Sequence, residues 1–216
     1  MRRKAYVVDY GIINLKNIVR GLEKVNADVE ICTHPRQLEK ASNIIVPGVG
    51  AFKIGMEEIK RRGFDEGLTR AVEKGLPMLG ICLGMQLFMQ ESFEHGQSLG
   101  LGFISGSVEQ IPTVTRHGQK RKVPHIGWGK ILIREPFSKH IFLKGLTEKA
   151  YFYFVHSYYV EPLDKKIILS NTQYGNLKYC SALRYKNITA FQFHPEKSGP
   201  SGIKIYLTLK NSLSNV

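Results

Sequence analysis

The segment Gly80-Ile81-Cys82-Leu83-Gly84 places a potential nucleophile between two glycines, each two residues away. It joins the apolar run Met78 to Ile81, which predicts a buried strand, to a stretch that predicts a helix from Leu83 to about Glu91. A side chain on such a turn needs small neighbours, because adjacent backbone must approach closely. The helix N-terminus offers free N–H groups and positive potential, which favour a thiolate. The sequence therefore predicts a nucleophile elbow at Cys82, with a small buried cysteine at a strand end as the alternative.

An imidazole and a carboxylate stand two residues apart in His194-Pro195-Glu196, directly after the alternating run Ala190 to Phe193. In an extended chain, residues i and i+2 face the same side. His194 could then take a proton from Cys82, while Glu196 holds the imidazole tautomer and stabilises the imidazolium. A His-Pro-Glu sequence at a strand end can also be a simple turn. The catalytic interpretation therefore depends on its coexistence with the cysteine elbow.

A third segment, Pro47-Gly48-Val49-Gly50, ends the apolar run Asn43 to Val46, and a loop is expected after it. Its glycines permit unusual backbone angles and leave backbone N–H groups available for an anion. The N–H groups of Val49, Gly50 and Leu83 could form an oxyanion hole for the oxygen that develops when a thiolate attacks a carbonyl. An ordinary turn between a strand and a helix is the alternative.

The hydrophobic pattern predicts the elements that position these residues. In the first half, short β-branched runs alternate with amphipathic stretches, as in a parallel sheet covered by helices. Strands are expected at 6–8, 29–32, 43–46 and 78–81, and helices at 15–22, capped by Asn14, and at 64–72. The second half is rich in predicted strands, at 130–134, 151–160, 167–169, 180–183 and 190–193. A helix over 201–213, with Ile203, Tyr206 and Leu207 on one face, closes the chain.

These elements predict a single α/β domain over residues 1–216, with a mixed central sheet flanked by helices. Open sheets of this class place their sites at the carboxyl ends of the strands. The composition is that of a globular protein, with 43% hydrophobic and 23% charged residues, and it excludes disordered, collagen-like and low-complexity chains. The 3 cysteines have neither a disulfide nor a zinc-site spacing, so no metal is expected.

Location and charge give further expectations. The N-terminal apolar run ends at Asp9, too early for an export signal, and no stretch is long enough to span a bilayer, so a cytoplasmic protein is expected. The net charge is +13, from 31 Lys and Arg against 18 Asp and Glu, but it is spread along the chain. Only residues 116–122 are densely basic, and they lack interleaved aromatic residues. A solvated loop is therefore favoured over a nucleic-acid site.

Taken together, these residues resemble the class I glutamine amidotransferases, which carry a Cys-His-Glu triad. The chain is further similar to the glutaminase subunits of imidazole glycerol phosphate synthase, through segments spread over nearly its whole length. These segments are Pro47–Phe52, Gly80–Gln86, Pro124–Trp128, Tyr153–Tyr158 and His194–Gly199.

The resemblance implies glutamine hydrolysis on a class I amidotransferase fold, without a cofactor. Cys82 would form a γ-glutamyl thioester, ammonia would leave with a proton from His194, and water would then release glutamate. The resemblance also implies that four residues hold glutamine, partly through their backbone: Gln86, Glu94, Ser157 and Tyr158.

The same resemblance implies a partner, a (β/α)8-barrel synthase subunit that receives the ammonia and builds the imidazole ring of a histidine precursor. The expected interface residues are Asn14, Asn17, Trp128 and Lys197. A lone tryptophan is otherwise commonly a core anchor. Glutaminase activity is expected to stay low until the partner binds its own ligand and the segment around Val49 reorganises.

Three features depart from the family pattern. Ile13 stands where a small residue is common, Gly129 stands where an Asn usually follows the tryptophan, and Thr113 to Lys122 is unusually basic. They leave open a paralogous subunit that supplies ammonia to an amidating enzyme of surface-sugar biosynthesis. Two other classes also remain open: a non-catalytic protein that binds nucleic acid or an acidic protein through its basic surface, and a cysteine hydrolase that acts on peptides in an open cleft.

Overall fold

The computed structural model describes residues 4–12, 14–114, 118–146 and 150–214. Within these ranges the strands form a nine-stranded mixed sheet and a separate four-stranded sheet. Ile13, Arg116 and His117, which the sequence pattern singled out, lie outside the described residues. No helix in the described part of the chain is long and apolar enough to cross a bilayer.

The first half of the large sheet is parallel. Its strands run in the order β2 (Val29–Cys32), β1 (Ala5–Val8), β3 (Asn43–Gly48), β4 (Met78–Cys82) and β13 (Ile188–Phe191). All residues of β1, β3, β4 and β13 are buried, as expected for strands covered on both faces.

The second half of the large sheet is antiparallel. From β13 it continues through β12 (Leu177–Tyr185), β11 (Ile168–Tyr174), β8 (His125–Ile133) and β9 (Tyr151–His156). The small sheet has the order β10 (Tyr158–Pro162), β7 (Ile104–Gln110), β5 (Met89–Ser92) and β6 (Ser98–Leu99). One residue, Ser157, separates β9 in the large sheet from β10 in the small one.

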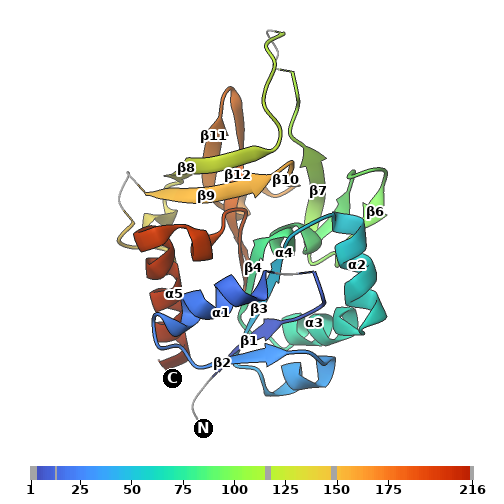
Figure 1. Cartoon of the computed structure of the whole chain (residues 1–216), viewed down its shortest axis with the longest axis vertical. Helices are drawn as coiled ribbons and strands as arrows, with labels where there is room; N and C mark the ends of the chain where they lie inside the picture. The colour runs from blue at the N-terminus through green and yellow to red at the C-terminus, as the bar shows by residue number, and fades with distance from the viewer. Residues whose placement is uncertain (1–3, 13, 115–117, 147–149, 215–216) are drawn as a thin grey trace.

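Helices cover both faces of the parallel strands (Figure 1). On one face lie α1 (Leu15–Glu23) and α5 (Gly199–Ser214), whose buried Leu22, Ile205 and Tyr206 join one core cluster. On the other face lie α2 (Phe52–Arg61), α3 (Phe64–Glu73) and the short α4 (Leu83–Leu87). These two layers confirm the α/β class that the sequence predicted.

Several predicted boundaries were wrong. Pro47 and Gly48 belong to β3, where they pair with Ile81 and Cys82 of β4. The expected loop after them is brief, because α2 begins at Phe52. The predicted helix from 83 to 91 ends at 87, since residues 89–92 pair with β6 and β7 instead.

Three side-chain and strand predictions also need correction. Residues 151–160 form two strands in different sheets, because the chain leaves β9 at Ser157. Asn14 precedes α1, but its side chain makes no capping hydrogen bond. In α5, Leu207 is 41% exposed, and the fully buried Ile205 takes its place beside Tyr206.

Candidate active site

The nucleophile elbow lies where β4 ends and α4 begins. Cys82 has φ 53° and ψ −110°, an unusual backbone conformation for a non-glycine residue. A Cβ on Gly84 would lie 1.8 Å from the carbonyl oxygen of Val46, and a Cβ on Gly80 would lie 2.6 Å from the Phe88 ring. The predicted need for small residues on both sides of Cys82 is therefore a need for glycine.

His194 and Glu196 form the second part of the site. The His194 Nδ1 atom lies 2.6 Å from Glu196 Oε1, and both side chains are almost fully buried, at 3% and 1% exposure. Because a carboxylate accepts, Nδ1 carries the hydrogen, which leaves Nε2 for a nucleophile. The backbone differs from the prediction: β13 ends at Phe191, and a 3-10 turn, η4 (Pro195–Lys197), brings the carboxylate back to the ring.

The pKa of His194 links the elbow to the His194–Glu196 pair. Burial alone would lower the pKa of His194, but the Cys82 sulfur and the Glu196 carboxylate outweigh it and raise the pKa to about 10. The Nε2 atom is buried and makes no regular hydrogen bond. The structure thus brings Cys82, His194 and Glu196 together with the imidazole favoured in its charged form.

Ser198 is a positioning residue that the sequence reasoning missed. Its hydroxyl donates to the His194 carbonyl at 2.6 Å and accepts the Tyr153 N–H at 3.0 Å. The His194 N–H in turn donates to the Tyr153 carbonyl at 2.9 Å. The histidine backbone is therefore held against the edge strand β9, a contact between segments about forty residues apart that local spacing does not reveal.

A cavity of about 620 Å³ opens at the elbow. It is lined by Cys82, by all three predicted oxyanion residues and by all four predicted glutamine-binding residues: Val49, Gly50, Leu83, Gln86, Glu94, Ser157 and Tyr158. Lys197 stands at the same cavity, whereas Asn14, Asn17 and Trp128 do not line it. Another cavity, of about 580 Å³, contains none of these residues. The elbow cavity is therefore the candidate substrate site.

Two of the lining residues already have structural partners. Glu94 Oε2 accepts the Phe52 N–H at 2.6 Å, so this carboxylate caps the N-terminus of α2. The Gln86 amide nitrogen donates to the Tyr158 carbonyl at 2.9 Å and to Gln192 Oε1 at 3.2 Å. Only the oxygen of the Gln86 amide is left to face a ligand.

In the Pro47–Gly50 segment, one of the predicted oxyanion donors already has a backbone partner. The Val49 N–H donates to the Ile12 carbonyl at 3.3 Å, so this predicted donor is occupied. Gly50 has φ +103°, the glycine-like conformation that the sequence suggested. An anion could be bound by Val49 only after this backbone hydrogen bond breaks.

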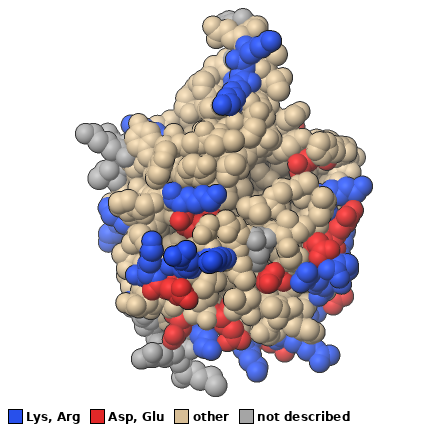
Figure 2. All heavy atoms as spheres, in the orientation of Figure 1, with Lys and Arg blue, Asp and Glu red and all other residues tan. Residues whose placement is uncertain are grey.

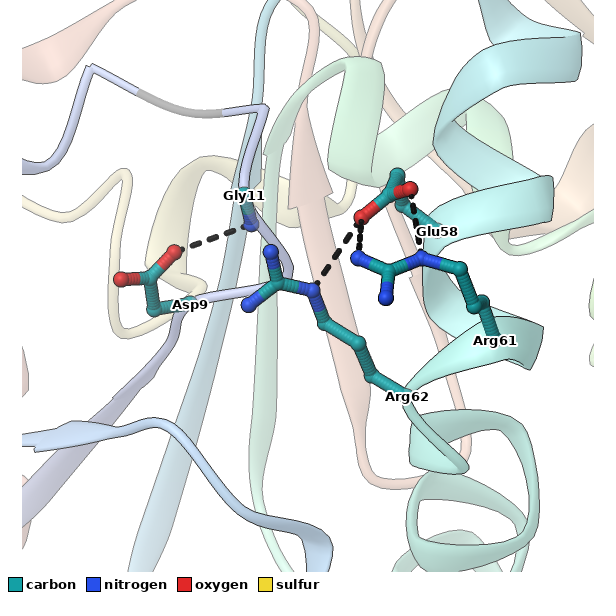
Figure 3. Close-up of polar contacts among 5 residues, drawn as sticks. All are labelled: Asp9, Gly11, Glu58, Arg61 and Arg62. Atoms are coloured by element: carbon teal, nitrogen blue, oxygen red, sulfur yellow. Dashed lines mark hydrogen bonds and ion pairs between the residues drawn. The ribbon is translucent and has the colours of Figure 1, made fainter.

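The loop that supplies the Ile12 carbonyl is braced from two sides (Figure 3). The Asp9 carboxylate accepts the Gly11 N–H at 2.9 Å. Arg62, the residue after α2, packs its side chain against this loop. A Cβ on Gly11 would lie 2.5 Å from the Arg62 Nη2 atom. Glu58 holds that arginine through an Nε to Oε2 contact of 3.2 Å. The hydrogen bond to Val49 is thus part of an ordered local structure.

An apolar surface lies on the outer face of β8 and β9. Trp128 is 57% exposed and pairs across the strands with Tyr153, with ring centroids 6.2 Å apart in an edge-on arrangement. The Lys197 Nζ atom lies 5.4 Å from the centre of the same Tyr153 ring. Trp128 is therefore no core anchor, and its neighbour Tyr153 is also the neighbour of Lys197, a residue of the substrate cavity.

Asn14 and Asn17, both half-buried, lie at and on α1. Asn17 lines a separate cavity of about 270 Å³ together with Glu196 and Tyr206. Gly129 is explained by packing, because a Cβ there would lie 2.9 Å from the Phe154 ring.

The basic connection between β7 and β8 projects from the molecule (Figure 1). The Arg121 guanidinium donates to the Pro112 carbonyl at 2.8 Å and also contacts Asn176. Figure 2 shows Lys and Arg on this projection, and basic and acidic side chains intermixed over the lower part of the same face. Such mixing gives no continuous basic stripe for nucleic acid on that face. The described residues also hold no group of three or more His, Cys, Asp or Glu side chains that could bind a metal.

Comparison with known proteins agrees with this geometry. The family model described as glutamine amidotransferase class-I matches residues 6–209. Imidazole glycerol phosphate synthase subunit HisH from Geobacillus sp. (strain WCH70) is 41% identical over 199 residues, which cover 92% of each chain. The subunit of the same name from Aquifex aeolicus is 38% identical over 208 residues, 96% of each chain.

Solved structures share the fold at low sequence identity. PurLQS from Thermotoga maritima superposes with a TM-score of 0.72 at 17% identity, covering 98% of this chain and 99% of that one. The glutaminase domain of Trypanosoma brucei CTPS, with bound acivicin, gives a TM-score of 0.68 at 18% identity, covering 99% and 94%. The structural likeness shows the architecture, and the sequence likeness is closer. The chain therefore belongs to the class I glutamine amidotransferases and, within them, to the HisH subunit family of imidazole glycerol phosphate synthase.

Proposed function

We propose that Cys82, His194 and Glu196 hydrolyse glutamine to glutamate and ammonia. The observation that carries this proposal is the buried His194 imidazole, which lies 2.6 Å from a carboxylate and interacts with the sulfur of Cys82, a residue that lines the cavity of about 620 Å³. Because the pKa of His194 is raised to about 10, the imidazole beside the sulfur is favoured in its charged form at neutral pH.

The steps follow from these positions. The Cys82 thiolate attacks the side-chain amide carbon of glutamine, and the resulting tetrahedral intermediate breaks its C–N bond. His194 gives its proton to the leaving nitrogen, which departs as ammonia, while Glu196 holds the ring. A water molecule, deprotonated by His194, then attacks the thioester and releases glutamate and the free sulfur.

The cavity suggests how glutamine binds. Gln86 offers its amide oxygen, since both of its N–H groups are occupied. Glu94 offers a carboxylate that suits the ammonium group of the substrate. Ser157 and Tyr158 line the cavity where the chain passes from the large sheet to the small one. We assign these four residues to substrate binding, and Val49, Gly50 and Leu83 to the oxyanion hole.

We further propose that residues 1–216 act as one amidotransferase domain in the cytoplasm, in complex with a (β/α)8-barrel synthase subunit of histidine biosynthesis. The relatives named above are subunits of imidazole glycerol phosphate synthase, which supports such a partner. The exposed Trp128 and the cavity residue Lys197 are both neighbours of Tyr153, which supports docking next to the substrate cavity. We also assign Asn14 and Asn17 to this interface. Direct transfer keeps ammonia from protonation in water.

The test is glutamate release from glutamine by the chain mixed with the synthase subunit of its own source, with and without that subunit's ribonucleotide ligand. We expect strong ligand-dependent stimulation, and a loss of at least a thousandfold in Cys82→Ala. Cys32→Ala is the matched control, because burial raises the pKa of that thiol to about 11. Glutamate release by Cys82→Ala would refute the catalytic assignment. If the chain is fully active and the synthase subunit does not change its rate, only the assignment to histidine biosynthesis is refuted.

A further inference from the structure

A buried network of hydrogen bonds ends at the nucleophile. The Gln192 amide nitrogen lies 3.7 Å from Cys82 Sγ, within reach of a hydrogen bond to sulfur. Gln192 is fully buried and Gln86, its neighbour, is 5% exposed. The network therefore acts where water competes little for these groups.

The direction of each hydrogen bond is fixed by one backbone carbonyl. The Tyr158 carbonyl can only accept, so the Gln86 group 2.9 Å from it must be the NH2 group. The second hydrogen of that NH2 group then faces Gln192 at 3.2 Å, so the Gln192 atom there must be the oxygen. The Gln192 NH2 group is consequently the one that faces Cys82.

The same carbonyl is held from its other side. His156 Nδ1 lies 2.8 Å from the Tyr158 oxygen and must donate to it, which leaves His156 Nε2 as an acceptor. The Tyr179 hydroxyl, 3.1 Å from Nε2, donates there and accepts from His125 Nδ1 at 2.9 Å. Burial lowers the pKa of His125 to about 4, consistent with a neutral ring that serves as a fixed donor.

We infer that Gln192 is a further catalytic residue, which donates a hydrogen bond to the Cys82 thiolate, and that the network from His125 to Gln86 keeps its amide in that orientation. This inference rests on the proposed role of Cys82 as nucleophile. A donor on sulfur favours the thiolate over the thiol, as a charge-assisted hydrogen bond does. It also holds the sulfur when His194 gives up its proton to the leaving group.

Gln192→Glu tests this role, because it keeps the oxygen that accepts from Gln86 and replaces the N–H beside the sulfur with a second oxygen. The measurement is the rate of alkylation of Cys82 by iodoacetamide in the full chain between pH 5.5 and pH 10. We expect about a tenfold or larger decrease at pH 6 in Gln192→Glu and about a tenfold decrease in Gln192→Leu. Both should recover toward the wild-type rate near pH 10, where the thiolate forms without help.

Controls separate this role from a structural one. Gln173→Leu removes an exposed glutamine whose amide donates to the Gly175 carbonyl, and it should leave the profile unchanged. Equal losses at all pH values, or a wild-type profile in Gln192→Glu, would overturn the inference. If both Gln192 variants fail to fold, Tyr179→Phe decides. It should lower the rate at pH 6 about threefold, and an unchanged rate would count against the network. None of these outcomes depends on glutamate release, so the proposed function stands or falls separately.

Discussion

The Cys82 elbow and the Pro47–Gly50 segment lie at the ends of the adjacent strands β4 and β3. The side chains proposed for catalysis are already grouped at the elbow, whereas a backbone donor of the neighbouring segment is hydrogen-bonded to another residue. At the elbow, Cys82, His194 and Glu196 are buried, His194 lies 2.6 Å from Glu196, and the Cys82 sulfur raises the pKa of His194. In the neighbouring segment, the Val49 N–H that would stabilise an oxyanion donates instead to the Ile12 carbonyl at 3.3 Å.

This contrast separates two requirements of the reaction. The groups proposed to activate Cys82 are assembled within one chain, whereas one of the proposed oxyanion donors, the Val49 N–H, is hydrogen-bonded to another residue. A missing oxyanion donor typically costs about a hundred- to a thousandfold in rate. With this arrangement, the sulfur of the isolated chain should react with simple alkylating agents, whereas efficient glutamine turnover should require the partner subunit.

The largest effect should come from the assembled side. In Glu196→Gln, an amide nitrogen can face His194 Nδ1 and favour the wrong tautomer, so glutamate release should fall about a thousand- to ten-thousandfold. The loss should be similar in the isolated chain and in the complex, measured at saturating glutamine. A loss seen only in the complex would show that the triad too is assembled by the partner.

The second effect concerns the surface through which a partner would act. Trp128→Ala should weaken binding of the synthase subunit about thirtyfold, as truncation of a central aromatic residue does. Alkylation of Cys82 in the isolated variant should be unchanged, because Trp128 does not line its cavity. Leu163→Ala, which truncates another exposed apolar side chain, is the control. A fall in both properties would show that Trp128 also supports the geometry of the Cys82 site.

A third measurement follows the Val49 amide itself. Hydrogen exchange at this N–H should be slow in the isolated chain and about tenfold faster or more in the complex with its ligand bound, as the hydrogen bond to Ile12 opens. The backbone N–H of Gln192, which donates to the Ser181 carbonyl at 3.0 Å, should stay protected from exchange in both states. Equal exchange at Val49 in both states would contradict gating by this segment.

The smallest effect is on stability. Since the pKa of His194 is about 10 in the folded chain and near 6.5 when unfolded, its contribution is fully present below pH 6.5 and is lost as the pH rises toward 10. In Cys82→Ala the His194 imidazolium loses one of the two neighbours that raise its pKa and keeps only Glu196, so this decline should flatten. Urea unfolding of both chains at pH 6, 8 and 10 measures the difference. Parallel curves would mean that Cys82 and His194 are not coupled.

The sequence was most informative where close approach demands particular residues. The glycines beside Cys82 predict the elbow, because no other residue fits against the Val46 carbonyl and the Phe88 ring. The pairing of His194 with Glu196 was also predicted, although the chain achieves it through a turn and not through an extended strand.

What the sequence could not reveal depends on distant partners. Gln192 and Ser198 owe their roles to contacts with Cys82 and Tyr153, which lie far away in the chain. The break at Ser157 was hidden because both sides of it have strand-like residues, and only pairing with β7 draws β10 into the second sheet. The occupied state of Val49 depends on a loop that local spacing does not describe.

The backbone conformation at Cys82 lowers the stability of the fold. A non-glycine residue at φ 53° and ψ −110° carries conformational strain of about 1–3 kcal/mol. Glycine would relieve that strain, but it would also remove the sulfur, so at this position stability and a reactive side chain exclude each other.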